Sequence, residues 1–187
     1  MIYIDDHIWD FDLEEALAAV SAERREYALR YRHERDRRLC VAAYRLLERA
    51  LKLEFGINAV PPFVKEENGK PSLEGLPGVH FNLSHCAEAV ACAVGTEPVG
   101  IDVESIGRYD AEVAAVAMSD EECAAIAASP QPEVEFARLW TMKESLYKLN
   151  GDYMADDLRT MLADTSRYRF STTIYPNFVC TTCQLQN

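Results

Sequence analysis

The segment Val99-Gly100-Ile101-Asp102-Val103-Glu104 follows Pro98 near the middle of the chain and is predicted to form a β-strand. Its apolar and acidic side chains alternate, so Asp102 and Glu104 share one face while the other face packs against a core. The chain before this strand and the chain that begins with it are both predicted to run in the order strand, helices and strands. We therefore predict an α+β fold with two similar halves, residues 1–98 and 99–187.

The longest predicted helix covers residues 34–55, where apolar residues recur at helical spacing, and Gly56 is a suitable C-terminal stop. Pro61-Pro62 begins a predicted loop that runs to Gly78. Ser21 is the expected N-cap of a shorter helix. The remaining expected elements are strands at residues 1–9, 79–83, 89–94, 167–174 and 178–185, and helices that begin near residue 12 or cover 110–118, 119–128 and 133–149.

The composition is that of an ordinary globular protein, with 187 residues of which 49% are hydrophobic. No apolar stretch reaches the roughly 18 residues of a membrane span, and the acidic start Met1–Asp6 does not resemble a signal peptide. We expect a cytoplasmic protein. Its six cysteines are then expected to be reduced. Cys180 and Cys183 lie on a predicted strand at a spacing that points their sulfurs to opposite faces.

Charge is distributed unevenly along the chain. The net charge is −12, yet residues 24–49 contain nine arginines against four acids. A nucleic-acid-binding protein is usually basic over a whole face, so this class is not expected. The basic segment suggests a local anion pocket, although a solvated helix face would have the same composition.

Asp102 and Glu104 form the first candidate site. Two like charges on one strand face repel each other unless a cation lies between them, so the pair suggests a divalent metal. An exposed polar face on an edge strand is the alternative.

Trp140, Glu144 and Lys148 are spaced four residues apart and lie on one face of the predicted helix 133–149. Glu followed by Lys at this spacing is also a common stabilising surface pair. Trp140 argues against a fully solvated face, because so large an aromatic ring normally buries most of its area. Catalysis by Glu144 and Lys148 therefore stands beside the surface-pair alternative.

Two shorter motifs carry groups that can contact phosphate. Ser84-His85 follows a predicted strand and offers a hydroxyl and an imidazolium, while Gly69-Lys70-Pro71 is a turn that could approach a ligand with its backbone. Either motif alone could be structural. Taken together, the three carboxylates, the histidine and the two lysines suit a metal that holds a diphosphate.

The four blocks GKP (69–71), FNLSHC (81–86), VGIDVE (99–104) and FARLWTMKESLYK (136–148) occur in an order and spacing that resemble the 4′-phosphopantetheinyl transferases of the larger, monomeric type. The resemblance implies two α+β halves related by a pseudo-twofold axis, with the active site between them. It also implies Mg²⁺-dependent transfer of 4′-phosphopantetheine from coenzyme A to a serine of an acidic carrier protein, which releases adenosine 3′,5′-bisphosphate. A coenzyme A or nucleotide-bisphosphate binding module without catalysis is the alternative.

The resemblance assigns roles to individual residues. Asp102, Glu104 and Glu144 match metal ligands, Glu144 matches a general base, and Lys148 matches a lysine beside the diphosphate. Ser84 and His85 match phosphate contacts, and His85 is included among the catalytic candidates. Gly69, Lys70 and Pro71 match a loop beside the adenine, and Arg24 matches a contact to the 3′-phosphate. The chain departs from the usual pattern at Tyr27, Cys40, Cys86 and Gly151–Met154.

Overall fold

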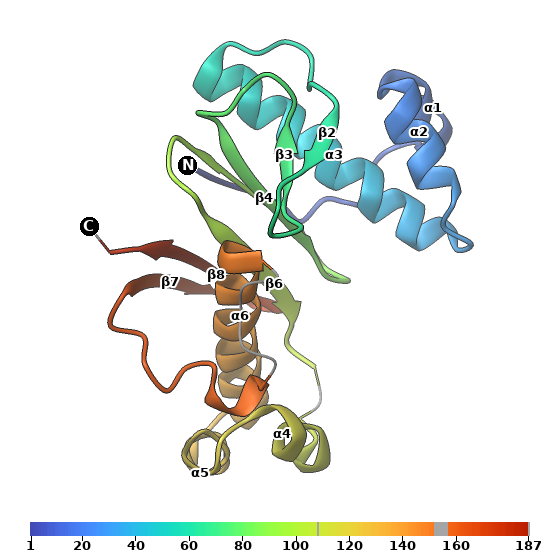
Figure 1. Ribbon diagram of the computed structural model, residues 1–187. Helices are drawn as coiled ribbons and strands as arrows, with labels where there is room; N and C mark the ends of the chain where they lie inside the picture. The colour runs from blue at the N-terminus through green and yellow to red at the C-terminus, as the bar shows by residue number, and fades with distance from the viewer. Residues whose placement is uncertain (108, 152–156, 187) are drawn as a thin grey trace.

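The computed structural model describes residues 1–107, 109–151 and 157–186. Most of the atypical segment Gly151–Met154 therefore lies outside the described residues. The α+β class is confirmed: helices and antiparallel sheets alternate along the chain (Figure 1). None of the helices in the described ranges has the length and apolar character needed to cross a membrane.

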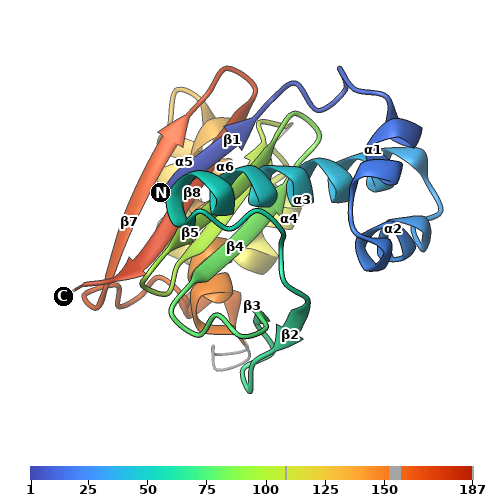
Figure 2. The ribbon, with the colours of Figure 1, turned by 90° about the horizontal axis from the view of Figure 1, so that it is seen from above.

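The first sheet is built from β1 (Ile2–Asp5), β5 (Val90–Gly95) and β4 (His80–His85), in that order and all antiparallel. Helix α3 (Glu34–Phe55) lies across this sheet (Figure 2) and buries its apolar stripe against it. The helix has the bounds predicted from its periodicity. Gly56 ends it with a φ of 68°, a left-handed conformation that glycine adopts without strain.

Two short helices lie at the N-terminal end of α3 (Figure 1), namely α1 (Leu13–Ala19) and α2 (Ala22–Leu29). The Ser21 hydroxyl accepts a hydrogen bond from the Arg24 N–H at 3.1 Å, which confirms it as the N-cap of α2. This cap fixes where α2 begins.

A small hairpin occupies part of the segment that the sequence predicted to be a loop. Strands β2 (Phe63–Lys65) and β3 (Pro71–Leu73) pair antiparallel, and the intervening turn includes Gly69 at a φ of 78°. The prediction was wrong because three-residue strands are too short to show a period-two pattern. Phe63 and Leu73 instead secure the hairpin by packing into the core beneath α3.

The second sheet repeats the strand order of the first. It consists of β6 (Gly100–Ser105), β8 (Phe178–Leu185) and β7 (Tyr168–Ile174), so in each sheet the last strand in sequence is the central one. Helix α6 (Pro132–Asn150) packs on this sheet, with α4 (Ala111–Ala117), α5 (Asp120–Ala128) and the short 3₁₀-helix Leu158–Thr160 beyond it. The division at residues 98 and 99, and the pseudo-twofold relation, stay predictions.

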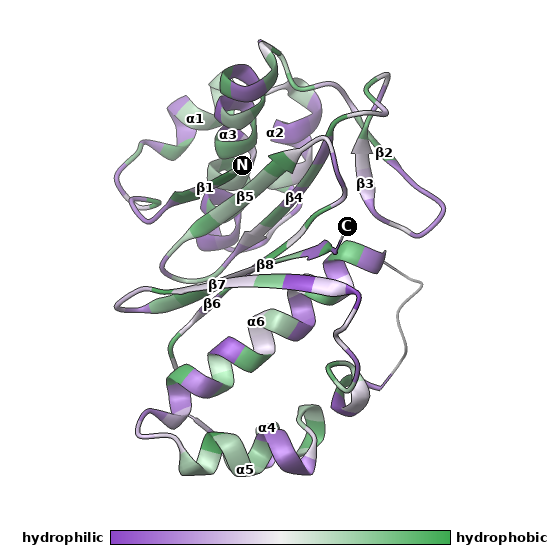
Figure 3. Cartoon of the chain, turned by 90° about the vertical axis from the view of Figure 1, so that its left-hand side faces the viewer, coloured by the Kyte–Doolittle hydropathy of each residue, from purple (hydrophilic) through white to green (hydrophobic). Residues whose placement is uncertain are grey.

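The two sheets pack face to face, with α3 outside one and α6 outside the other (Figure 3). Small side chains of β5, including Ala91 and Ala93, meet Ile101, Val103 and Cys180 between the sheets. Cys183 belongs to a different cluster, beneath α6, as its predicted orientation requires. The apolar face of β6 therefore holds the sheets together, and its acidic face is turned toward α6.

Candidate functional site

Strand β6 places its two carboxylates as the alternation predicted. Asp102 is only 2% exposed, and Glu104 is partly buried. The intervening Val103 is fully buried against the first sheet. β6 is an edge strand of its sheet, but the burial of Asp102 and the partial burial of Glu104 exclude the alternative of an exposed polar face.

Gly100 lets α6 approach the beginning of β6 very closely. A Cβ atom at this position would lie 1.9 Å from the Ser145 carbonyl oxygen and 2.7 Å from the Leu149 nitrogen. Only a residue without a side chain fits here. This contact brings the face of α6 that carries Glu144 and Lys148 to the acids of β6.

Lys148, Ser84 and Asp102 meet in one hydrogen-bonded cluster, although they come from α6, β4 and β6. The Lys148 ammonium donates to Asp102 Oδ1 at 2.6 Å and to Ser84 Oγ at 3.0 Å. The Ser84 hydroxyl donates to the same Asp102 oxygen at 2.8 Å and accepts from the Val103 N–H at 3.2 Å. Within the part of the chain that the structure describes, Asp102 Oδ2 is buried and has no hydrogen-bond partner.

The ion pair of Lys148 decides between the two interpretations of the helix motif. In the described residues Lys148 forms its ion pair with Asp102, which is 46 positions away in the sequence, and not with Glu144 one helical turn earlier. The surface-pair alternative is therefore wrong. Trp140 is partly buried and stacks on Phe136 with ring centroids 6.2 Å apart, so this helix face is not solvated.

Glu104 and Glu144 are both influenced by the charge on Asp102. Burial, followed by the Asp102 charge, raises the pKa of Glu104 to about 7, and Lys148 and a hydrogen bond to Trp140 oppose this rise. Burial and Asp102 also raise the pKa of Glu144. Carboxylates that disfavour each other's ionised form attract a cation. Even so, among residues 1–107, 109–151 and 157–186 no three His, Cys, Asp or Glu side chains are gathered in an arrangement that could hold a metal.

His85 lies at the end of β4 and is accessible to solvent, yet enough protein surrounds its ring to desolvate it in part. Desolvation of the ring, followed by the nearby Lys148 charge, lowers its pKa below the ordinary 6.5. The lowered pKa disfavours the imidazolium form that the sequence predicted. A bound anion would favour its protonation.

The Gly69-Lys70-Pro71 loop contacts the C-terminal end of α6. The Lys70 ammonium donates to the carbonyl oxygens of Leu149 at 3.0 Å and Val99 at 3.4 Å. Burial lowers the pKa of Lys70. Because this side chain donates to one of the last carbonyls of α6 and to the residue before β6, it anchors the β2–β3 hairpin to both elements.

Arg24 is held in an aromatic box. Its guanidinium carbon lies 5.1, 4.7 and 4.8 Å from the ring centroids of Tyr27, Tyr44 and Phe63. No contact between Arg24 and the acids of β6 is present in the described part of the chain. The hairpin that supplies Phe63 also reaches α6 through Lys70, so it connects the two regions.

Several residues of the site escaped the sequence analysis. Asn82 Oδ1 accepts the Ile101 N–H at 2.9 Å, one of the side-chain contacts that join β4 to β6. The Ser105 hydroxyl donates to Glu88, which ties the turn after His85 to the end of β6. Asn82 and Ser84 are two positions apart on one strand, so their period-two polar pattern was a usable signal. Nothing in the sequence indicated Glu88.

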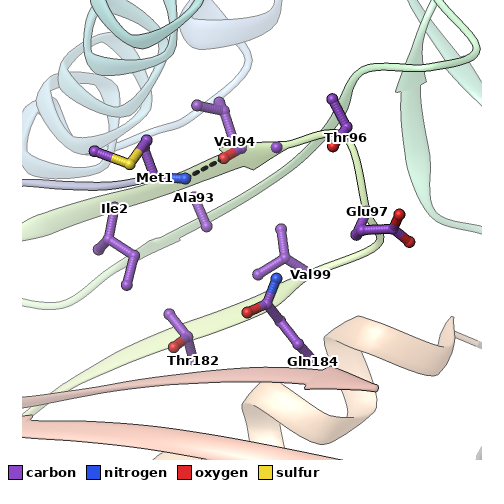
Figure 4. Close-up of a pocket in the computed structure, with 10 residues that line it drawn as sticks. Met1, Ile2, Ala93, Val94, Thr96, Glu97, Val99, Thr182 and Gln184 are labelled. Atoms are coloured by element: carbon purple, nitrogen blue, oxygen red, sulfur yellow. Dashed lines mark hydrogen bonds between the residues drawn. The ribbon is translucent and has the colours of Figure 1, made fainter. Parts of the chain in front are cut away.

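Two pockets lie near the sheets. The pocket in Figure 4 has a volume of about 380 Å³ and opens at the ends of β5 and β6, and the acids of β6 do not line it. A second, of about 210 Å³, lies beside Glu104 and is lined mainly by apolar residues that include Val113, Phe136 and Trp140. Only the second pocket adjoins the candidate site.

Comparisons of the sequence with known proteins identify its family. The model of the 4′-phosphopantetheinyl transferase superfamily matches residues 98–184. A 4′-phosphopantetheinyl transferase of Bacillus subtilis is 33% identical over 153 residues, which are 80% of this chain and 68% of the relative. The chain belongs to this family. The transferase psf-1 of Bacillus pumilus is 32% identical over 87% of this chain and 71% of its own, and gsp of Aneurinibacillus migulanus is 31% identical over 88% and 68%. The enzyme class expected from the four sequence blocks, a transferase of this type, is confirmed.

Proposed function

We propose that this enzyme transfers 4′-phosphopantetheine from coenzyme A to a serine of an acidic acyl or peptidyl carrier protein and releases adenosine 3′,5′-bisphosphate, with Mg²⁺ required. The observation that carries the proposal is the cluster of Lys148, Ser84 and Asp102. It gathers a cation, a hydroxyl and a buried carboxylate from three separate elements, directly beside Glu104 and Glu144.

The chemistry of the donor set suits Mg²⁺, although the three carboxylates are not gathered around one centre in the described residues. This ion takes oxygen ligands and retains several waters, so it needs few protein groups. Asp102 offers a buried oxygen without a partner in the described residues, and its charge raises the pKa of both Glu104 and Glu144. These three carboxylates would hold the ion. When bound, it would offset diphosphate charge and polarise the reacting phosphorus.

The remaining side chains have roles that follow from their chemistry. Lys148 can donate to the diphosphate and stabilise or protonate the leaving phosphate. Ser84 and His85, at the end of β4, can donate hydrogen bonds to phosphate oxygens. Glu144 has a raised pKa and can accept the proton of the carrier serine directly or through water. A carboxylate that already binds a metal is a weaker base, so these two roles of Glu144 compete.

Coenzyme A would extend along the β2–β3 hairpin. Arg24, at one end, offers a guanidinium to the 3′-phosphate, and the Gly69–Pro71 backbone would lie beside the adenine. At the other end lie Lys148 and the acids. The apolar pocket beside Glu104 has room for part of the pantetheine arm. We also propose that the enzyme acts as a cytoplasmic monomer, without nucleic acid or membrane as a partner.

The test is transfer measured by mass spectrometry of an apo carrier protein, comparing Asp102→Asn with Glu14→Gln. Both substitutions remove one negative charge, but Glu14 is exposed on α1. We expect Asp102→Asn to lower the rate of transfer at least about 100-fold, since the Asp102 carboxylate pairs with Lys148 and would also bind the metal. Glu14→Gln should keep the wild-type rate. Full transfer by Asp102→Asn would refute the metal assignment, and binding of coenzyme A without any transfer would favour a non-catalytic binding module.

A further inference from the structure

Lys148 already contacts one oxygen of the Asp102 carboxylate to which a metal would bind, and the other oxygen, Oδ2, is buried and has no partner in the described residues. Its ammonium lies 2.6 Å from Asp102 Oδ1, and the Asp102 side chain is only 3% exposed. We infer that Lys148 is the resident counter-ion of Asp102, and that a divalent metal binds well only after the diphosphate of coenzyme A has drawn Lys148 away. This inference rests on the proposed function, because it assigns an order of binding to the same site.

The geometry makes the two cations alternatives at one carboxylate. A metal bound to Asp102 would lie about 2 Å from a carboxylate oxygen, close to an ammonium that already contacts the same group. Two positive charges at such a separation repel strongly in a partly buried site. The competition also explains why the carboxylates are not gathered around a common centre in the described residues: Lys148 supplies the positive charge that Asp102 needs.

The Lys148 side chain is free to change its position, whereas the Asp102 side chain is held in place. The Lys148 side chain is 26% exposed and ends a flexible four-carbon stem. Asp102 is held by strand pairing to Thr181 and by the Ser84 hydroxyl. A diphosphate offers the ammonium several charged acceptors in exchange for one carboxylate oxygen and one hydroxyl. The exchange therefore transfers Lys148 to the substrate and frees Asp102 in a single movement.

The consequence is cooperative binding. Coenzyme A should strengthen metal binding by more than its own metal contacts provide, and the metal should strengthen coenzyme A binding by the same factor. Removing the lysine side chain should remove the part of this coupling that comes from the exchange. The metal alone should then bind more tightly than it does to the wild type.

The experiment is Mn²⁺ binding followed by electron paramagnetic resonance, with and without coenzyme A and with no carrier present. We expect Lys148→Met to bind Mn²⁺ alone roughly tenfold more tightly than the wild type, the factor that one charged hydrogen bond commonly contributes. The factor by which coenzyme A improves Mn²⁺ binding should fall in this variant. Lys52→Met removes the same charge from an exposed position on α3 and should behave as the wild type.

Two outcomes would overturn the inference. One is Mn²⁺ affinity in Lys148→Met no higher than in Lys52→Met. The other is a coenzyme A effect of equal size in Lys148→Met and the wild type, because simple charge repulsion without exchange predicts that result. Ser84→Ala, which loses one anchor of Lys148, provides a second variant in case Lys148→Met does not fold, and should tighten Mn²⁺ binding by a smaller factor. Transfer to a carrier is measured separately, so failure of the proposed function can be recognised independently of these binding results.

Discussion

Replacing Gly100 by alanine should disable the site without touching any polar group in it. The new Cβ would lie 1.9 Å from the Ser145 carbonyl oxygen, whereas non-bonded atoms normally approach to about 3.5 Å, so α6 must move by roughly 1.6 Å. The obstructing atoms are backbone, and no side-chain rotation can relieve the clash. A shift of this size would break the 2.6 Å contact between Lys148 and Asp102.

We expect Gly100→Ala to lower kcat/KM for transfer to a carrier protein about 100-fold, the usual cost of misplacing catalytic groups by about 1 Å. Overpacking should also lower the free energy of unfolding by about 1–3 kcal/mol, measured by urea denaturation. Gly95→Ala is the matched control, because its Cβ would meet nothing closer than 3.8 Å. Activity of Gly100→Ala within about twofold of Gly95→Ala would refute the argument that close packing of α6 positions the site.

Three further predictions concern other contacts. Lys143 is fully buried and pairs with Glu122 at 2.8 Å. Lys143→Met should lower the free energy of unfolding by about 3–5 kcal/mol because it leaves the Glu122 charge without its partner, and adding Glu122→Leu should recover part of this loss. A loss below about 1 kcal/mol would contradict this. Because His85 has a lowered pKa in the folded protein, the unfolded chain binds more protons as the pH falls through about 6.5. The free energy of unfolding of the wild type should therefore fall more steeply on acidification than that of His85→Asn. Equal pH profiles of the two in urea denaturation would count against desolvation of the ring. Lys70→Met should raise the KM for coenzyme A and lower the free energy of unfolding by about 1–3 kcal/mol, because the hairpin loses its contact with α6. Lys65→Met, at an exposed position on the same hairpin, should have neither effect. Equal effects of the two substitutions would disprove the anchoring role of Lys70.

Patterns that repeat within one element were sufficient to predict most of the fold. The apolar stripe of α3 and Gly56 gave this helix its bounds, and the alternation around Asp102 gave β6 its orientation. The β2–β3 hairpin could not be predicted in this way. Its strands are stabilised by the packing of Phe63 and Leu73 beneath α3, and that contact is long-range.

The site was predictable as a set of residues but not as a set of contacts. The sequence indicated that Asp102 and Lys148 belong to functional motifs, yet 46 positions separate them and no periodicity links them. Lys70 contacts a helix end 79 positions away, for the same reason. The lowered pKa of His85 depends on desolvation and on Lys148, which only the assembled fold brings close.

The most direct test of phosphopantetheinyl transfer is the intact mass of an apo carrier protein after incubation with this enzyme and coenzyme A, with Mg²⁺ or with a chelator. We predict that the carrier gains the mass of one phosphopantetheine only when the metal is present, and that adenosine 3′,5′-bisphosphate appears in equal amount. An unchanged carrier mass across several apo carriers, with the enzyme folded and coenzyme A bound, would contradict the account.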